Sequence, residues 1–237
     1  MDIRWHGHSF FSLTCKDGTK VLVDPFVENG MTRRRVADFQ PDFILVSHAH
    51  ADHVGSAPEW GVPCIATYEL AGILEARGAR GSVGLNTGGF WRHGKLKVWC
   101  APALHSSGFH REGDHFQGYG GVACGFVVDD GETRFYHAGD TGLFGDMRTV
   151  IRDLLQPHVA AVPIGDLFTM GPEHAARAVE WLGVNLAIPM HYDTFPPIHA
   201  DPHEFAKRVG TAARVLVPPV DGGIEVHGPK VGRELAP

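Results

Sequence analysis

The sequence contains little cysteine. It has four among 237 residues, and no two of them form a Cys-x-x-Cys pair. All four lie in or beside apolar runs, which is typical of buried, reduced thiols. The four are Cys15, Cys64, Cys100 and Cys124. We therefore expect free thiols in the protein interior and no disulfide framework.

Long apolar runs are also missing. No stretch approaches the ~18 apolar residues that a membrane-spanning helix needs. The first residues, MDIRWHGHSF, contain no apolar signal region. These two absences predict a cytoplasmic protein that does not bind membranes.

Positive charge is in deficit as well. Lys and Arg together number 21 against 27 Asp and Glu, so the formal net charge is −6. This balance disfavours nucleic acid and anionic membranes as partners, although a local basic patch could still exist. The only basic run, Arg33 to Arg35, is interpreted as a solvated face, with phosphate binding as the alternative.

Histidine, in contrast, is abundant. The chain has 16 histidines, and imidazole is the commonest metal ligand in proteins. His93, His158, His203 and His227 lie in polar surroundings, and we expect them at the surface. The remaining histidines include a dense cluster.

That cluster is the segment VSHAHADHVG, residues 46–55. His48 and His50 follow an apolar run, and their side chains can point the same way because alternate residues of an extended chain share a face. Asp52 and His53 can then face a second centre as the chain turns. Four such groups are too few for two metal ions, so the pattern requires further ligands elsewhere.

Three more candidate ligands each follow a predicted strand. His105 follows the run that ends at Ala101, Asp140 follows residues 133–137, and His191 follows residues 186–189. Side chains at several strand ends can meet at one edge of a sheet. Together with the His-x-His-x-Asp-His motif, these positions predict a metal site there.

The regular structure follows from short runs rich in Val, Ile and Phe, bounded by Gly, Pro and Asp. These predict strands at 2–5, 10–15, 20–24, 43–47, 64–66, 95–101, 122–129, 133–137, 159–163, 186–189, 214–217 and 223–226. Helices are predicted at 68–77, 143–155, 172–182 and 201–209 from apolar spacing and terminal Pro, Gly and Asp. We therefore predict one α/β domain over residues 1–237, with two sheets packed face to face and helices outside.

The motif and its spacing resemble the metallo-β-lactamase superfamily. They are most similar to a branch of metal-dependent hydrolases related to the ascorbate-6-phosphate lactonases, and the resemblance runs from residue 2 to about residue 206. It is carried by WHGHS at 5–9, DPF at 24–26, HSS at 105–107, HAGDTGLF at 137–144, PIGDLFTMG at 163–171 and IPMHYDTFP at 188–196. His6 departs from this branch, which usually has an apolar residue there.

The resemblance implies a four-layer αβ/βα sandwich with a dinuclear centre at its edge. It implies one metal ion held by His48, His50 and His105, a second held by Asp52, His53 and His191, and Asp140 bridging the two. Imidazole and carboxylate ligands without a thiolate suit Zn²⁺, with Mn²⁺ or iron as alternatives. Two divalent ions, most readily zinc, are therefore expected.

The resemblance also assigns groups beside the metals. Asp52 is the candidate acceptor of a proton from the attacking water. His8 and His137 are expected nearby as hydrogen-bond partners or as the proton donor, and the alternative is that they hold loops in place. Asp24 is expected to orient a ligand histidine or, alternatively, to cap a turn.

Two features suggest how a substrate could be enclosed. The Gly-rich segment 105–121 is interpreted as a mobile lid, with an inert loop as the alternative. Its side chains at His110, Asp114 and His115 are expected to face solvent. Phe168, Met170 and Phe195 lie in the family-like segments and are expected either to form an apolar wall or to pack in the ordinary way.

These expectations combine into a predicted activity. The chain is expected to hydrolyse an ester, lactone or phosphodiester bond of a small molecule with a hydroxide activated between two metal ions. The alternatives are an iron-dependent oxidoreductase or dioxygenase on the same scaffold, and a metal-binding protein without catalysis. A homo-oligomer is expected only as a general tendency of soluble proteins.

Overall fold

The structure is a computed structural model that describes residues 1–110 and 117–237. Its strands are β1 (Asp2–Trp5), β2 (Phe11–Thr14), β3 (Lys20–Val23), β4 (Phe43–Leu45), β5 (Cys64–Thr67), β6 (Val83–Leu85), β7 (Phe90–His93), β8 (Leu96–Pro102), β9 (Gly108–His110), β10 (Gln117–Tyr119), β11 (Cys124–Asp129), β12 (Arg134–His137), β13 (Val159–Pro163), β14 (Leu186–Met190), β15 (Arg214–Val215), β16 (Gly223–His227) and β17 (Lys230–Leu235). Its helical segments are η1 (Val36–Asp38), α1 (Ala51–Val54), η2 (Ala57–Trp60), α2 (Tyr68–Ala76), η3 (Met147–Leu155), α3 (Pro172–Leu182), η4 (Pro196–Ile198) and α4 (Pro202–Val209).

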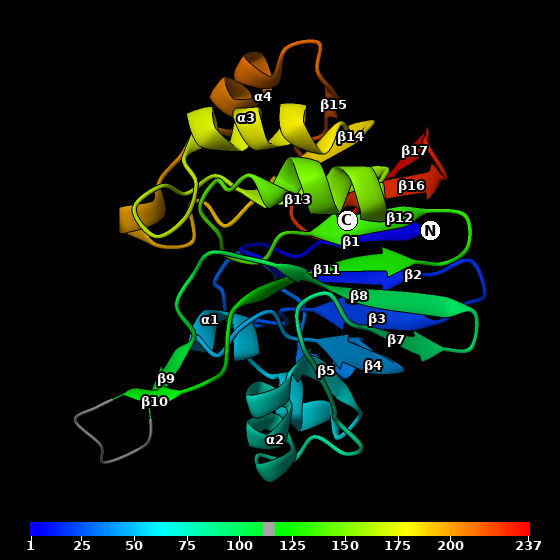
Figure 1. The fold of residues 1–237 in the computed structure, drawn as a ribbon, viewed down its shortest axis with the longest axis vertical. Helices are drawn as coiled ribbons and strands as arrows, with labels where there is room; N and C mark the ends of the chain where they lie inside the picture. The colour runs from blue at the N-terminus through cyan, green and yellow to red at the C-terminus, as the bar shows by residue number, and fades with distance from the viewer. Residues whose placement is uncertain (111–116) are drawn as a thin grey trace.

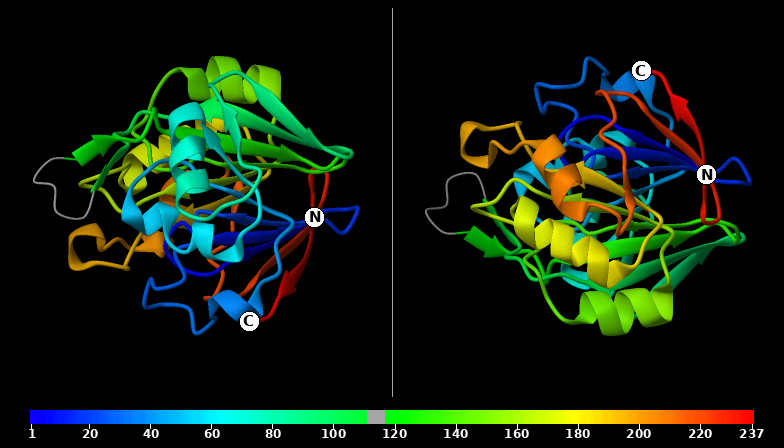
Figure 2. Two further views of the ribbon diagram at one scale, coloured as in Figure 1. Left: turned by 90° about the horizontal axis from the view of Figure 1, so that it is seen from below. Right: turned by 90° about the horizontal axis from the view of Figure 1, so that it is seen from above.

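Two large sheets lie face to face, with helices on their outer faces (Figures 1 and 2). One sheet has the strand order β17-β16-β1-β2-β3-β4-β5-β6, and the other has the order β15-β14-β13-β12-β11-β8-β7. Helices α1 and α2 lie on the first sheet, while η3, α3 and α4 lie on the second (Figure 1). This arrangement is the four-layer αβ/βα sandwich that the sequence predicted.

The main core fills the space between the sheets. Side chains such as Ile3, Phe11 and Phe126 alternate toward this layer and are fully buried. A second apolar cluster lies between the first sheet and α2, where Leu70 and Leu74 are fully buried. Burial of each such side chain contributes about 1.5–3 kcal/mol. The two clusters hold the sheets rigid beneath their loops.

The strand directions bring several strand ends to one edge. Strands β3, β4, β5 and β6 are parallel to one another, and so are β12, β13, β14 and β15. Strand β8 runs in the direction of β12, because both are antiparallel to β11. The carboxyl ends of parallel strands share an edge, which is where open α/β sheets carry their ligands.

The structure corrects several predicted boundaries. Strands β6, β7, β9, β10 and β17 lie outside the predicted ranges. The sequences of β7 (FWRH) and β17 (KVGREL) are short of apolar alternation because both strands lie at a sheet edge and face solvent. These strands form by pairing with a neighbouring strand, so their own residues give little indication of strand structure.

The helix predicted at 143–155 begins only at Met147. Before it, the N–H groups of Met147 and Arg148 donate to the carbonyls of Phe144 and Gly145 in tight turns, at 3.2 and 3.0 Å. Asp146 then accepts a hydrogen bond from the Thr149 hydroxyl at 2.9 Å. The helices at 172–182 and in the 201–209 region are confirmed, with Asp201 capping α4.

Other expectations can be checked by burial. All four cysteines are free and buried, as predicted. His93, His203 and His227 are exposed, but the surface prediction is wrong for His158. Its ring is half-buried, and its Nδ1 accepts a hydrogen bond from the Arg134 backbone N–H at 3.2 Å. No helix in the described part of the chain is long and apolar enough to cross a membrane.

Candidate metal centre

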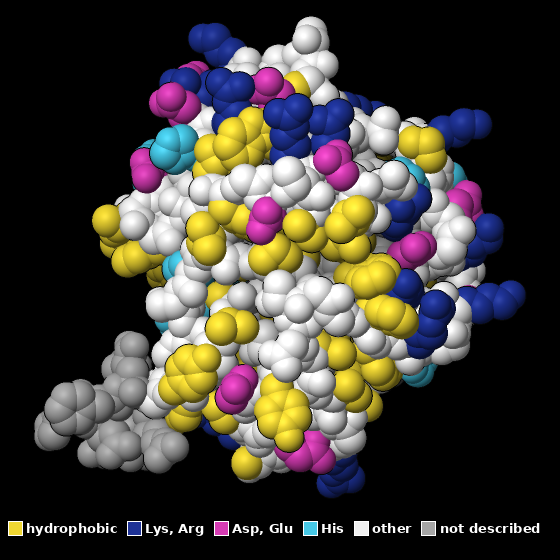
Figure 3. Space-filling model, in the orientation of Figure 1, with side chains coloured by type: hydrophobic (Ala, Val, Ile, Leu, Met, Phe, Trp, Pro, Cys, Tyr) yellow, Lys and Arg dark blue, Asp and Glu magenta, His cyan; other side chains and the backbone are white. Residues whose placement is uncertain are grey.

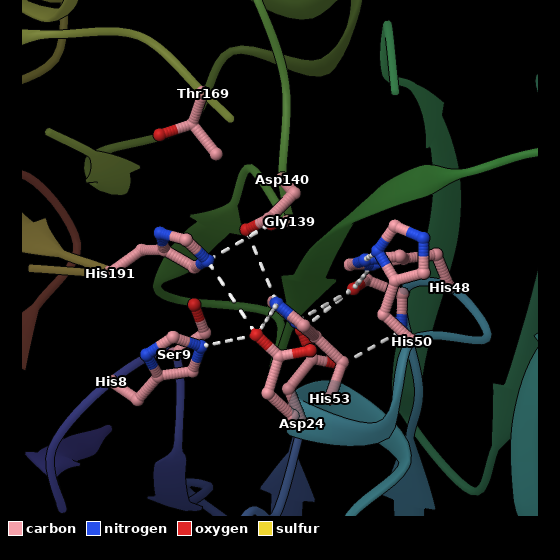
Figure 4. A network of polar contacts seen from close by, with 12 residues as sticks. His8, Ser9, Asp24, His48, His50, His53, Gly139, Asp140, Thr169 and His191 are labelled. Atoms are coloured by element: carbon pink, nitrogen blue, oxygen red, sulfur yellow. Dashed lines mark hydrogen bonds and ion pairs between the residues drawn. The ribbon is translucent and has the colours of Figure 1, made fainter. Parts of the chain in front are cut away.

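The predicted motif lies where β4 ends and turns into a single helical turn, α1 (Figure 4). His50 precedes α1 in an extended conformation, whereas Asp52 and His53 lie on the helical turn itself, where the chain was expected to turn. Gly55 ends the turn at φ 43°. A Cβ atom there would lie 2.5 Å from the carbonyl oxygen of Pro25, so only glycine lets α1 pack this closely.

The first predicted ligand group comes together. His48 Nε2 lies 2.9 Å from His50 Nδ1, and His105 Nε2 lies 3.3 Å from that same nitrogen. Ligand atoms of all three side chains lie within 4.8 Å of one another. Burial lowers the pKa of each of these histidines below its ordinary value, so their nitrogen lone pairs are available at neutral pH.

The second predicted group also converges. Nε2 of His53 and Nε2 of His191 lie 4.0 and 3.9 Å from Oδ2 of Asp52. Ligand atoms of these three residues and of His8 lie within 4.8 Å of one another. His191 directly follows β14 and has a left-handed φ of 55°, a conformation that persists in non-glycine residues chiefly where function requires it.

Asp140 lies between the two groups. Its Oδ1 is 3.3 Å from Nε2 of His53, and its Oδ2 is 3.0 Å from Nε2 of His191 and 3.6 Å from Nε2 of His105. Burial alone would raise the pKa of Asp140, but the charges of His191 and His53 lower it well below the ordinary value. The carboxylate therefore contacts His105 of the first group and two histidines of the second, as the predicted bridging role requires. Figure 4 shows its contacts with His53 and His191.

Several polar atoms at this site are buried without a hydrogen bond in the described structure. They are Nε2 of His53, Oδ1 of Asp140 and both ring nitrogens of His191. Leaving a buried polar atom unsatisfied costs about 1–3 kcal/mol, so a cluster of such atoms calls for a further partner. Imidazole nitrogens and carboxylate oxygens together suit a divalent transition-metal ion. The residues present fit a bound metal.

Asp24 supports one of the candidate ligands from behind. Its Oδ2 lies 2.7 Å from Nδ1 of His53, and its Oδ1 accepts the backbone N–H of Ser47 at 2.7 Å. The Ser47 hydroxyl donates to Oδ2 at 2.7 Å. Of the two roles considered for Asp24, the structure shows the orienting one, because the bond at Nδ1 leaves Nε2 of His53 free to face Asp140.

His8 supports Asp52. Its Nε2 lies 3.1 Å from Oδ2 of Asp52, and its Nδ1 lies 2.9 Å from the hydroxyl of Thr194. Burial lowers the pKa of His8 to about 4, so the ring is neutral at pH 7 and carries one proton. Since a carboxylate only accepts, that proton lies on Nε2, and the Thr194 hydroxyl donates to Nδ1. His8 is thus a hydrogen-bond partner of the cluster.

His137 is buried beneath the cluster, but its ring is already occupied. Nε2 is bonded to the backbone oxygen of Ser9 at 2.9 Å, and Nδ1 accepts the N–H of Gly139 at 3.2 Å. Neither nitrogen is left to donate a proton to a leaving group. The geometry therefore does not support the proton-donor role predicted for His137 and favours the alternative, a histidine that holds the loop before Asp140.

Some supporting residues were missed by the sequence interpretation. Ser47 and Thr194 each hold a group that touches the cluster, and both lie in segments that had been singled out, VSHAHADHVG and IPMHYDTFP. Their adjacency to a predicted ligand was an available signal. A hydroxyl next to a ligand is too common in loops, however, to indicate by itself which atom it bonds.

The structure describes the basic run in full and the predicted lid segment only in part. Strands β9 and β10 form a hairpin, but the segment 105–121 includes residues 111–116, so Asp114, His115 and the lid itself lie outside the described residues; His110 is in β9. Arg33, Arg34 and Arg35 are exposed on the loop after β3. Arg35 is near Asp38 at 3.9 Å, in agreement with a solvated face.

Comparison with known proteins decides the family. The model described as "Beta-lactamase superfamily domain" matches residues 19–192, which is most of the chain. The chain belongs to the metallo-β-lactamase superfamily. The resemblance stated from the sequence is confirmed at this level, while the nearer link to the ascorbate-6-phosphate lactonases stays a prediction.

Relatives within the superfamily are similar over nearly their whole length. The "UPF0173 metal-dependent hydrolase" of Deinococcus radiodurans is 45% identical over 230 residues, which covers 92% of this chain and 97% of the relative. The protein of the same name from Methanobrevibacter smithii is 43% identical over 216 residues, covering 88% and 89%. These relatives confirm the predicted class, a metal-dependent hydrolase.

A solved structure agrees with this class. Igni18, described as a novel metallo hydrolase from the hyperthermophilic archaeon Ignicoccus hospitalis, superposes with a TM-score of 0.82 at 35% sequence identity. The match covers 93% of this chain and 95% of Igni18. The sandwich described above is therefore shared with a metallo hydrolase over almost all of its elements.

Proposed function

We propose that this hydrolase holds two divalent metal ions, zinc in the first place, and cleaves an ester, lactone or phosphodiester bond of a small molecule. The observation that carries the proposal is the position of Asp140, whose carboxylate contacts histidines of both ligand groups at 3.0–3.6 Å. A carboxylate shared by two sets of imidazoles is suited to bridging two cations. We assign His48, His50 and His105 to one ion and Asp52, His53 and His191 to the other.

When bound, the ions would act as Lewis acids and make hydroxide available from water near neutral pH. Asp52 is the group placed to accept the proton of that water. The hydrogen bond from His8 fixes the rotation of the carboxylate, whose side chain is 29% exposed and therefore reachable by water. Burial would raise the pKa of Asp52, but the bond from His8 and the charge of His53 lower it below its ordinary value. The group is therefore an ionised acceptor.

Asp24 contributes by fixing a tautomer. With its oxygen 2.7 Å from Nδ1 of His53, Asp24 would hold the ring proton on Nδ1 when a metal is bound, and the lone pair on Nε2 would then face the cluster. Ser47 completes the support by donating to both oxygens of Asp24, one bond from its backbone and one from its hydroxyl. The ligand geometry is thus set by residues that touch no substrate.

The test begins with metal content per chain, measured by mass spectrometry on protein purified without chelator. We expect close to two equivalents in the parent protein and a reduced content in His50→Ala and Asp140→Ala. The same three proteins are then assayed on panels of esters, lactones and phosphodiesters, with the exposed His203→Ala as the matched control. About one equivalent at saturation, or metal content unchanged in Asp140→Ala, would contradict the dinuclear assignment.

The assay also tests the chemistry itself. Hydrolysis of at least one panel by the parent protein and by His203→Ala, but not by Asp140→Ala, supports the proposed function. Tightly bound iron with a visible absorption band, together with no hydrolysis of any panel, would overturn it. Metal binding without turnover on any panel would overturn it as well.

A further inference from the structure

Four large apolar side chains are exposed on the loops that surround the metal centre. The exposed fractions are 59% for Leu104, 68% for Leu167, 57% for Phe168 and 37% for Phe195. Three different strands lead into these loops, since Leu104 follows β8, the pair Leu167 and Phe168 follows β13, and Phe195 follows β14. Figure 3 shows apolar side chains at the left margin, where Figure 1 places η4 and the loop before α3.

Hydrogen bonds at Thr141, the residue after Asp140, fasten two of these loops together. The Thr141 hydroxyl oxygen accepts the N–H of Leu104 at 2.9 Å, and its carbonyl oxygen accepts the N–H of Met170 at 3.1 Å. The Gly142 N–H donates in turn to the Leu104 carbonyl at 3.1 Å. Leu104 and the loop of Phe168 are therefore fixed directly beside the bridging carboxylate.

The third loop is joined to the second at Gly165. A Cβ atom on Gly165 would lie 2.2 Å from the carbonyl oxygen of His191 and 2.9 Å from Cβ of Ile198, so the two backbones are in contact. Phe195 lies with its ring 5.5 Å from that of His8, the partner of Asp52. We call Leu104, Leu167, Phe168 and Phe195 the apolar rim, because the three loops that carry them contact one another beside the metal centre.

The rim includes a strained turn. Asp166 and Leu167 have φ values of 55° and 42°, in the left-handed region that a branched side chain such as leucine rarely adopts. Asp166 holds this turn by accepting the Leu167 N–H on Oδ1 and the Thr169 N–H on its carbonyl, both at 3.0 Å. Strain of this kind persists mainly at functional sites. Here it presents two apolar side chains to solvent.

Within the described residues, the loop segments that carry the apolar rim and the candidate ligands contain no lysine or arginine side chain. Residues 46–55, 103–109, 138–146, 164–172 and 190–202 contain no Lys or Arg in the sequence. The charged residues on the loops of Phe168 and Phe195 include the carboxylates Asp166 and Asp193, and Asp193 is paired with His199 at 2.7 Å. A phosphate or carboxylate held against the rim would find no guanidinium or ammonium group on these loop segments. Arg77, which follows α2, instead lines a separate hollow with His50 and Phe109 that includes none of the rim residues.

We propose that the substrate is an ester or lactone whose group next to the scissile bond is an uncharged hydrocarbon chain or ring, held by the apolar rim. This inference rests on the proposed function. Of the three bond types proposed there, it keeps the ester and the lactone. Hydrocarbon on the rim covers side chains that are otherwise exposed to water, while the metal centre receives the polar, reacting end. A phosphorylated sugar would instead place polar and charged groups against the apolar rim.

The first experiment is a chain-length series of 4-nitrophenyl esters from acetate to decanoate, measured on the metal-loaded protein. We expect kcat/KM to rise about two- to fourfold per added methylene over the first few members, as expected when a methylene leaves water. Leu167→Ala/Phe168→Ala should flatten this rise. Leu154→Ala, which removes a 70%-exposed leucine from η3, is the matched control and should keep it.

Circular dichroism melting and metal content show whether the double variant is folded and loaded. A chain-length dependence that is missing from the parent protein, or equal in the parent and the double variant, would overturn the inference. So would a phosphorylated lactone hydrolysed with a higher kcat/KM than its unphosphorylated counterpart.

The second experiment separates this inference from the proposed function, because it measures binding alone. Acetate and octanoate are titrated into metal-loaded protein by calorimetry, with the same two variants. Octanoate binding at least about tenfold tighter than acetate, and loss of that preference in the double variant only, supports the rim even if no ester is hydrolysed. If esters are hydrolysed but acetate and octanoate bind equally well, the proposed function would stand and the proposed role of the apolar rim would be wrong.

Discussion

His6 and His53 are both buried histidines, and each is bonded through Nδ1 to an aspartate at 2.7 Å. The partner is Asp221 for His6 and Asp24 for His53. Burial opposes the charged form of both rings, and each carboxylate favours it. Burial prevails for His6, whose pKa is lowered, whereas Asp140 and Asp24 together raise the pKa of His53 above its ordinary value. Judged by that side of the ring alone, the two pairs would be assigned the same role.

The other side of the ring separates them. Nε2 of His6 is bonded to the Ser12 hydroxyl at 2.7 Å, so every polar atom of that ring has a partner. Nε2 of His53 has no hydrogen bond and faces Asp140 at 3.3 Å. A histidine whose two ring nitrogens are both hydrogen-bonded links one part of the chain to another. A histidine with one nitrogen unbonded can offer that nitrogen to a metal ion. The open nitrogen, and not the aspartate, marks the metal site.

The sharpest test of this comparison is to remove each ring. His53→Ala should lower metal content and reduce kcat/KM more than ~100-fold, beyond the range usual for residues that only support a ligand. His6→Leu should keep both values, because its ring has no open nitrogen. Metal content by mass spectrometry and initial rates on the best ester check the pair. Equal losses in the two variants would mean that the open nitrogen has no special role.

The second test measures what the metal adds to stability. Zinc at about 100 times its dissociation constant should raise the free energy of unfolding by ~2.7 kcal/mol in the parent protein and in His6→Leu. For a chain of this length, that corresponds to about 5–10 °C in Tm. Thermal melts followed by circular dichroism should show little or no such rise for His53→Ala. A full rise in His53→Ala would count against its place among the ligands.

The third test replaces each of the two aspartates, in separate variants, by asparagine. Asp24→Asn keeps the shape but weakens the bond to Nδ1 of His53, so metal affinity should fall by about 10–100-fold. Asp221→Asn makes the same chemical change beside His6 and should leave metal affinity unchanged. Competition with a fluorescent zinc chelator measures both. Were Asp221→Asn to weaken metal binding as much, the two networks would have to be coupled.

The smallest expected effect concerns pH. Burial lowers the pKa of His6 below its ordinary 6.5, against the opposing bond to Asp221. The unfolded chain therefore binds the proton more readily than the folded one, and stability that is present above pH 6.5 is lost as the pH falls below it. Other buried histidines contribute to the same slope, so His6→Leu should make it shallower between pH 6.5 and 5 without abolishing it. Urea unfolding of metal-loaded protein at several pH values gives the slope, and an unchanged slope would exclude His6 as one of its sources.

The sequence was sufficient to predict which candidate ligands lie close together, because these residues are tied to strand ends. His105, Asp140 and His191 each follow an apolar strand, and strand ends of one direction meet at an edge. The same logic predicted the sandwich, since two series of buried strands with helices between them have few other ways to pack. Alternating apolar residues and terminal caps are local signals, and local signals can be read from sequence.

What escaped prediction depends on contacts between distant parts of the chain. Asp221 is 215 residues from His6, and nothing in either neighbourhood indicates the pairing. The turn α1 is too short for any periodic pattern, and it exists because Gly55 allows it to pack against Pro25. His137 matched the family segment, yet its ring nitrogens are occupied by backbone groups that no pattern reveals.

Thr141 has a consequence for how this hydrolase can diversify. Because its side chain and backbone bind the loops after β8 and β13, a change in the length of one loop shifts the other and the neighbouring Asp140. The loops after β8 and β13 should therefore change together when substrate specificity changes. An engineer who transplants a single loop should expect an inactive chimaera, and the smallest exchangeable module is the set of loops that share this threonine.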